Sequence, residues 1–251
     1  MNIRRMLSAL ALASLVVPAI GFAQALPDGK ALVAKHIAAI GGREALDKHT
    51  SLHQTGTFSM AAMGIDGPIH VYRAKPARFL QQITLGSFGE MTQGFDGTTA
   101  WAIQPMQGPM IMSGDQATQF RQQADFYADF PDVSKYSSIE TVAAEDFEGH
   151  KCYKVKLVKA DGTGDAMQYF DAETGLAAGV VRTIENPQMG KMDVTVVFSD
   201  YKDQGGFKMP SKVTQKTPQG DVVLTFTAYE WDKVESKMFD LPEAVKGMVK
   251  P

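Results

Sequence analysis

Hydrophobic and polar residues alternate with a period of two along most of the chain after about residue 51. Successive side chains of a β-strand point to opposite faces of a sheet, so this alternation predicts strands. Turn signals such as Asp96-Gly97 and Asp161-Gly162 separate them. The predicted strands cover residues 51–60, 67–74, 77–85, 88–95, 98–104, 139–147, 150–159, 165–171, 176–186, 191–201, 208–216 and 221–231.

Two stretches have the three-to-four-residue spacing of an amphipathic helix instead. Residues 28–40 begin at Asp28, a suitable N-cap, and end at Gly41-Gly42, a suitable C-terminal stop. Residues 113–130 repeat the pattern, and Pro131 prevents the helix from continuing. The chain therefore has two predicted helices for about a dozen strands.

The short connections between strands predict antiparallel pairing rather than βαβ units. We expect a mainly β (α+β) fold, in which one large curved antiparallel sheet forms an unclosed half-barrel with a few helices over its concave face. Residues 191–201 and 221–231 carry apolar side chains on both faces. Because two helices cover one face only in part, either a second layer packs there or a hydrophobic cavity remains.

Residues 1–25 have the order of a secretory signal peptide. Arg4 and Arg5 precede an apolar run, and Ala23-Gln24-Ala25 forms an A-x-A cleavage site. We expect cleavage after Ala25, a periplasmic location and a single domain over residues 26–251. No later stretch has the ~18 consecutive apolar residues of a transmembrane helix, so no membrane span is expected in the mature protein. The single cysteine, Cys152, lies far from the cleavage site, which argues against a lipid anchor.

Composition narrows the class further. The net charge is −3, and Lys and Arg are scattered rather than grouped in a basic stripe, which argues against nucleic acid as a partner. One cysteine excludes an intramolecular disulfide framework. Cys152 lies in a strand pattern and is expected to be a small buried hydrophobe rather than a reactive thiol.

The sequence lacks the common catalytic motifs, including H-E-x-x-H, G-x-S-x-G and the phosphate-binding glycine loops. We therefore expect no enzymatic activity, no cofactor and no metal. A hydrolase with paired acids stays a third alternative, since sequence does not reveal spatial clusters.

His49 and His53 straddle a predicted helix-to-strand transition, which disfavours a shared metal site. His36 is expected at the edge of the core. The string DGTGD at 161–165 superficially resembles a calcium loop but is better explained as a hairpin turn.

Methionines gather in the first half of the chain, at positions such as Met60, Met91 and Met112. Methionine is flexible and polarizable, so it suits either a surface that adapts to apolar ligands or gap-filling in a core. Copper(I) binding by thioethers is a further alternative, but no His or Cys cluster lies near them in the sequence.

The order of several short motifs resembles a known family. IGGREAL is followed by VYRAKPARFLQQI and FDGTTAW, then by MQYFDAETGL, VVFSDYK and GGFKMPSKV, and finally by a strand that ends in YEW. Over residues 28–242 this arrangement is similar to the outer-membrane lipoprotein-sorting protein superfamily (LolA/LolB/RseB-like), and in particular to its uncharacterised exported branch. The resemblance implies an unclosed antiparallel barrel whose helices lie over a concave side that holds acyl chains or other lipids.

Two functional hypotheses follow from the pattern and the resemblance. The first is a soluble periplasmic carrier that binds lipid or lipoprotein acyl chains, exchanges them with inner- or outer-membrane transfer partners and opens by movement of helix 113–130. The alternative is an envelope sensor or interaction module, in which the same half-barrel fold binds a protein partner. A continuous apolar cavity above ~300 Å³ would favour carriage, and a packed interior would favour the interaction module. The predicted cavity residues are Phe58, Met60, Val71, Phe79, Ile83, Trp101, Ile103, Phe120, Phe198 and Phe226.

Overall fold

The computed structural model describes residues 25–128, 130–186 and 190–249. The predicted signal peptide therefore lies outside the described residues, apart from Ala25. Within the described part of the chain, no helix is both long enough and apolar enough to span a membrane.

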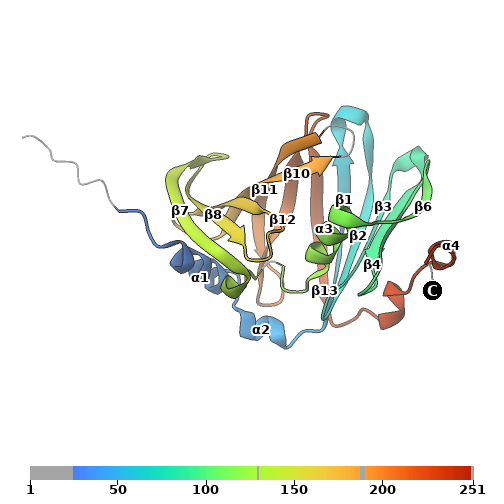
Figure 1. Cartoon of the computed structure of the whole chain (residues 1–251), viewed down its shortest axis with the longest axis horizontal. Coiled ribbons are helices and arrows are strands. Elements are labelled where there is room, and N and C mark those ends of the chain that lie inside the picture. Colours follow the sequence, from blue (N-terminus) through green and yellow to red (C-terminus); the bar gives the residue numbers. More distant parts are fainter. Residues whose placement is uncertain (1–24, 129, 187–189, 250–251) are drawn as a thin grey trace, which may run out of the picture.

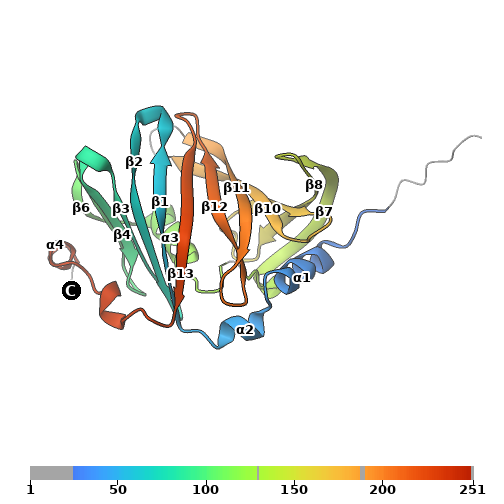
Figure 2. The ribbon, with the colours of Figure 1, turned by 180° about the vertical axis from the view of Figure 1, so that it is seen from behind.

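Thirteen strands form one antiparallel sheet that curves into an unclosed half-barrel, as the sequence pattern predicts (Figures 1 and 2). The strands are β1 (Ser51–Met60), β2 (Ile65–Ala74), β3 (Arg78–Thr84), β4 (Glu90–Phe95), β5 (Ala100–Gln104), β6 (Gly108–Ile111), β7 (Tyr136–Phe147), β8 (His150–Lys159), β9 (Asp165–Asp171), β10 (Ala177–Asn186), β11 (Gly190–Asp203), β12 (Lys208–Lys216) and β13 (Val222–Trp231).

The sheet consists of two meanders joined at its centre. Strands β1 to β6 follow one another to one edge, and strands β13 back to β7 follow one another to the other edge. Among the described strands, β1 and β13 are the only sheet neighbours distant in sequence, and they pair from Leu52–Trp231 to Ser59–Val223. This single pairing makes one sheet out of two halves.

The helices are α1 (Gly29–Ala39), α2 (Arg43–Asp47), α3 (Gly114–Ala124) and α4 (Glu243–Lys246), together with the short 3₁₀ turns η1 (Ala61–Met63), η2 (Gly86–Phe88), η3 (Val133–Lys135) and η4 (Ser236–Phe239). Helices α1 and α3 pack on the concave face, whereas α4 packs on the other face beside Trp101. Figure 1 shows α3 in front of the central strands, and Figure 2 shows those strands in front of it, so α3 covers one face only.

The first helix begins and ends where the sequence predicts. The Asp28 side chain accepts a hydrogen bond from the backbone N–H of Ala31 at 2.9 Å, which confirms the N-cap. Gly41 and Gly42 follow at positive φ, a conformation that glycine adopts readily. Leu32 and Val33 pack against strands β8 to β10, so α1 covers the second meander.

The second predicted helix is shorter than its sequence pattern indicates. The prediction for residues 113–130 is wrong beyond Ala124, where α3 ends. The Asp125 carboxylate accepts a hydrogen bond from the backbone N–H of Tyr127 at 3.0 Å, and this local turn replaces helical hydrogen bonds. The residues after Asp125 then leave the helix axis, which changes where their aromatic side chains point.

The sequence pattern also misses the short elements, among them α2, α4 and β6. The α2 helix has only five residues and no side-chain N-cap. Strand β6 has four residues and contains Pro109, which suits its position at the sheet edge. Elements this short provide too few residues for a periodic signal.

Gly56 allows β1 and β13 to approach closely at the centre of the sheet. The pairing shifts register between Thr55 and Gly56. A Cβ atom at Gly56 would lie 2.2 Å from the backbone oxygen of Thr225, a distance that no relaxed structure tolerates. The backbone of one strand would have to move to admit even a methyl group.

We expect Gly56→Ala to destabilise the protein by about 1–3 kcal/mol, because relief of the clash must distort the β1–β13 pairing. Urea unfolding followed by circular dichroism measures this. Gly247→Ala is the matched control, since a Cβ atom there meets nothing within 4 Å; its effect should stay within about 0.5 kcal/mol. Equal effects of the two substitutions would contradict the prediction.

A hydrogen-bonded junction ties the end of β13 to the start of β1. One carboxylate oxygen of Asp232 accepts hydrogen bonds from the backbone N–H of Thr50 at 2.6 Å and from its hydroxyl at 3.1 Å. The other lies 2.6 Å from Nδ1 of His49. Partial burial alone would raise the pKa of Asp232, but the hydrogen bonds from Thr50 and His49 outweigh it and lower the pKa to about 2.

Because the folded-state pKa lies below the ordinary value of 3.8, Asp232 stabilises the fold above about pH 4 and loses this contribution as the pH falls toward 2. We expect Asp232→Asn to lower stability at pH 7 and to flatten the loss of stability between pH 4 and pH 2. Asparagine tolerates the positive φ at this position. Urea unfolding over that pH range measures both effects, with the exposed Asp66→Asn as control; identical pH profiles for wild type and Asp232→Asn would contradict the prediction.

Candidate functional site

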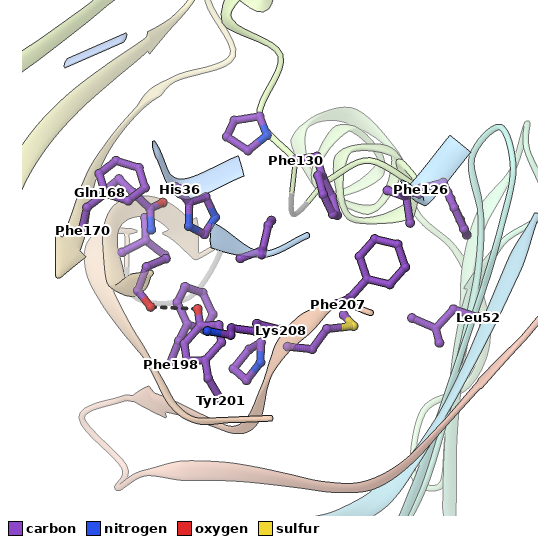
Figure 3. Close-up of a pocket in the computed structure, with 18 of the residues that line it drawn as sticks. His36, Leu52, Phe126, Phe130, Gln168, Phe170, Phe198, Tyr201, Phe207 and Lys208 are labelled. Carbon is purple, nitrogen blue, oxygen red and sulfur yellow. Dashed lines mark hydrogen bonds between the residues drawn. The ribbon is translucent and has the colours of Figure 1, made fainter. Parts of the chain in front are cut away.

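A cavity of about 250 Å³ lies at the concave face between α1 and the segment that follows α3 (Figure 3). Its lining combines residues from both meanders, from α1 and α2, and from the stretch after α3, namely Phe126, Ala128, Phe130 and Pro131. The lining residues labelled in Figure 3 are His36, Leu52, Phe126, Phe130, Gln168, Phe170, Phe198, Tyr201, Phe207 and Lys208.

One wall of the cavity is aromatic. The ring centroids of Phe130 and Phe207 are 6.1 Å apart, and those of Phe207 and Trp231 are 4.9 Å apart. The indole N–H of Trp231 donates a hydrogen bond to the backbone oxygen of Gln204 at 2.9 Å. With that polar group satisfied by the backbone, the rings present apolar surface to the cavity.

The opposite wall combines strand residues with α1. Phe170 of β9 and Phe198 of β11 contribute apolar side chains. The imidazole of His36 lies 5.3 Å from the Phe170 ring, and His36 is only 7% exposed. This position agrees with the expectation that His36 belongs to the apolar stripe of its helix.

Neutral polar groups of the lining are turned toward the backbone. Gln168 donates a hydrogen bond from Nε2 to the backbone oxygen of Gly179 at 3.0 Å. The hydroxyl of Tyr201 donates to the backbone oxygen of Ala177 at 2.8 Å. These bonds satisfy buried polar atoms and leave the cavity surface largely apolar.

The charged residues among the described cavity lining are both cationic. Arg73 of β2 and Lys208 at the start of β12 line the cavity. Among the described residues that line it there is no Asp or Glu. Lys208, which is exposed, therefore places a positive charge beside the apolar walls.

Most of the predicted cavity residues lie beside this cavity, in a closely packed cluster under α3. Met60 and Phe120 pack against that cluster, and the rings of Phe79 and Phe120 meet edge to face with centroids 6.4 Å apart. The buried members of the predicted set are Phe58, Val71, Phe79, Ile83 and Phe226. Of the ten predicted residues, Phe198 lines the cavity.

Trp101 and Ile103 lie on the other face of the sheet. Trp101 is 2% exposed and packs with Phe239 and Val245 of the C-terminal segment, and Ile103 packs against the same cluster. Their neighbour in β5, Ala100, belongs to the cluster under α3. Successive side chains of β5 point to opposite faces of the sheet, so Trp101 and Ile103 point away from the concave cavity.

Sequence reasoning missed the aromatic wall. The helical spacing predicts a continuous helix through Phe126 and Phe130, and Gly205-Gly206 before Phe207 predicts a turn. The Asp125 turn is the local signal that releases Phe126 and Phe130 from the helix. The position of Phe207 depends on the contact of its loop with α1, where the Lys208 N–H donates to the Ile40 carbonyl at 3.1 Å.

The remaining chemical candidates are explained by local structure. Within the described residues, no group of three or more His, Cys, Asp or Glu side chains is arranged to hold a metal ion. In the DGTGD string, the Asp161 carboxylate accepts hydrogen bonds from the backbone N–H and hydroxyl of Thr163 at 2.9 and 2.6 Å. This is a turn between β8 and β9, as the sequence indicated.

Cys152 is buried, with 2% exposure, in a cluster with Phe147 and Tyr169. Burial raises the pKa of its thiol to about 11, and the nearby carboxylates of Asp171 and Asp146 add to this. A thiol with this pKa is protonated at neutral pH. Its environment fits the expectation of a small buried hydrophobe.

Similarity to known proteins is found at the level of structure and not of sequence. No family model matches the chain, and no curated protein matches it. A LolA superfamily protein from Nitrosomonas europaea superposes with a TM-score of 0.57 at 13% identity, over 86% of this chain and 99% of that one. The chain has a LolA-like fold.

Two further structures agree with this LolA-like fold. A DUF1329 family protein from Desulfovibrio piger matches with a TM-score of 0.56 at 11% identity, over 86% of this chain and 98% of that one. A domain assigned to outer membrane lipoprotein sorting, from Vibrio parahaemolyticus, matches with a TM-score of 0.54 at 11% identity, over 84% of this chain and 96% of that one. At such identities the likeness establishes the fold, and function must be argued from the cavity.

Proposed function

We propose that this LolA-like protein is a soluble periplasmic carrier that shelters an acyl chain of a lipid or lipoprotein in its half-barrel. The observation that carries the proposal is the apolar cavity on the concave face, between Phe130, Phe207 and Trp231 on one side and Phe170 and Phe198 on the other. Binding in it needs no covalent chemistry. The predicted signal peptide and the fold of lipoprotein-sorting relatives support an envelope role.

The driving force is the removal of an acyl chain from water. Each buried methylene contributes roughly 0.8 kcal/mol, so several buried methylenes contribute several kcal/mol. The aromatic lining has its polar groups hydrogen-bonded to backbone, as at Trp231 and Tyr201, and therefore loses little on contact with hydrocarbon.

The cavity volume of about 250 Å³ lies below the expected ~300 Å³, so a long chain requires extra space. The segment after α3 is the element we propose to move, since Phe126 and Phe130 contribute one wall. The Phe126 N–H donates to the Pro76 carbonyl at 3.4 Å, the Tyr127 hydroxyl donates to Asp47 at 2.7 Å, and the Arg43 guanidinium lies 4.5 Å from the centroid of the Tyr127 ring. These contacts must break when the segment moves. The free energy spent on this movement reduces the net affinity and makes the cargo releasable to inner- or outer-membrane transfer partners.

We expect the purified mature protein to bind a fluorescent fatty acid, and Ala128→Trp to weaken this binding at least tenfold. Ala128 is exposed and lines the cavity, so an indole there can fill the opening without disturbing the core. Fluorescence titration measures the affinity, and native mass spectrometry after organic extraction detects lipid that copurifies.

The matched control is Ala144→Trp, which places the same indole at an exposed position on β7 outside the cavity. It should bind the fatty acid like the wild type. Protein that is always empty and fails to bind the probe would refute the carrier function. Equal weakening by both substitutions would refute the location of the site.

The edge strand β7 favours a second function, that of an envelope sensor or interaction module. This strand has twelve residues, ends the sheet and pairs on one side only, with β8. Its free side presents backbone donors and acceptors to which a strand of a partner protein can add. Val142 on this strand is 40% exposed and offers an apolar contact.

If the second function holds, a pull-down from periplasm should yield one stoichiometric protein partner and no lipid. Thr141→Pro should abolish that capture, because proline removes a donor and distorts the edge. The Ala128→Trp protein should still capture the partner. Capture that survives Thr141→Pro would exclude β7 as the docking edge.

A further inference from the structure

The charge of the cavity lining indicates which class of apolar molecule suits it. The chain as a whole is acidic, with 28 Asp and Glu against 25 Lys and Arg. The described lining nevertheless contains Lys208, and none of the described lining residues is Asp or Glu. An exposed cationic group beside apolar walls suits a ligand whose apolar tail carries an anionic head group.

Lys208 is held by its backbone in a position that directs its side chain. Its N–H donates to the carbonyl of Ile40 at the end of α1, at 3.1 Å. On the other side, Phe207 accepts a backbone hydrogen bond from Gln204 at 2.7 Å, which closes the tight turn before β12. Figure 3 shows the Lys208 side chain extending toward Tyr201 within the cavity lining.

The ammonium group of Lys208 is available to a ligand. In the described part of the chain no ion pair or side-chain hydrogen bond joins it to an acidic residue. Its neighbour across the β11–β12 pair is Asp203, whose carboxylate instead accepts a hydrogen bond from the Gly206 N–H at 3.0 Å. Lys208 is exposed, whereas the apolar walls behind it are buried, so its charge marks the solvent side of the cavity.

The size of the cavity limits the number of chains. A volume of about 250 Å³ lies just under the range of roughly 300–1,000 Å³ that is usual for small-molecule pockets. It suits a single hydrocarbon chain better than a bundle of chains. The lining thus matches a molecule that has one apolar tail and one head group at the mouth.

We propose that the ligand is a single-chain amphiphile with an anionic head group, carboxylate or phosphate, that binds Lys208 while its tail lies between Phe198 and Phe207. This inference rests on the proposed carrier function and adds the ligand class and the residue that selects it. The contact is a charge-assisted hydrogen bond from the ammonium group to a head-group oxygen.

The experiment compares three ligands of one chain length: hexadecanoate, hexadecyl phosphate and uncharged hexadecanol. Binding is read from the intrinsic fluorescence of Trp231, which lines the cavity; Trp101, the other tryptophan, is buried on the opposite face. We expect both anions to bind the wild type about five- to tenfold more tightly than the alcohol, as for a partly exposed charge-assisted contact. A preference for only one anion identifies the head group.

Lys208→Gln should bring the affinity for the anions close to that for hexadecanol and leave the affinity for hexadecanol unchanged. Lys202→Gln is the matched control, since Lys202 is an exposed lysine of β11 that does not line the cavity. It should keep the wild-type preference. An anion preference that survives Lys208→Gln would overturn the assignment of Lys208.

The outcomes separate this inference from the carrier function. Equal affinity of the wild type for all three ligands would refute the anionic ligand and leave the carrier function standing. If none of the three binds, the carrier function fails and the ligand class fails with it. A circular-dichroism melt of each variant confirms that lost preference does not reflect lost folding.

Discussion

The pairing of β1 with β13 is the interaction on which the rest of this structure depends. Each half of the chain builds its own meander by local hairpins, and only this pair joins them into one sheet. The close approach at Gly56 and the hydrogen bonds that Asp232 accepts from Thr50 fix the register and the end of the pair. Without this junction the sheet would be two open fragments, each with an exposed apolar face.

The cavity is a consequence of how that joined sheet is covered. The α1 helix packs against the second meander through Leu32 and Val33, and α3 packs against the first through Phe120. Between the two helices, Phe126, Phe130 and the turn before β12 supply aromatic side chains. Loops and irregular segments are generally less firmly held than helices, so the proposed carrier function would admit cargo at this part of the concave face. A carrier needs such a place, because its cargo must enter and leave.

Much of the fold could be predicted because it depends on local signals. The alternation of apolar residues located twelve of the strands, and Asp28 with Gly41 and Gly42 located α1. The same reasoning failed after Ala124, where the Asp125 side chain forms a turn that periodicity does not encode. The predicted set of cavity residues also has Trp101 on the same face as Phe79, whereas the structure puts these two residues on opposite faces of the sheet. Alternation within a strand is readable from sequence, but the phase between strands depends on register and bulges.

The sequence by itself determined the class of the molecule: an antiparallel, mostly β chain with too few helices to cover a large sheet, and with turns at its Asp-Gly and Gly-Gly sites. Only the tertiary structure decided where the uncovered space lies and which side chains line it. Phe130, Phe170, Phe207 and Lys208 come from distant segments, and their meeting depends on the curvature of the sheet and on the β1–β13 pairing. These are cooperative, long-range properties. Hydrophobic patterning specifies which residues avoid water, but the packing of the whole chain selects their neighbours.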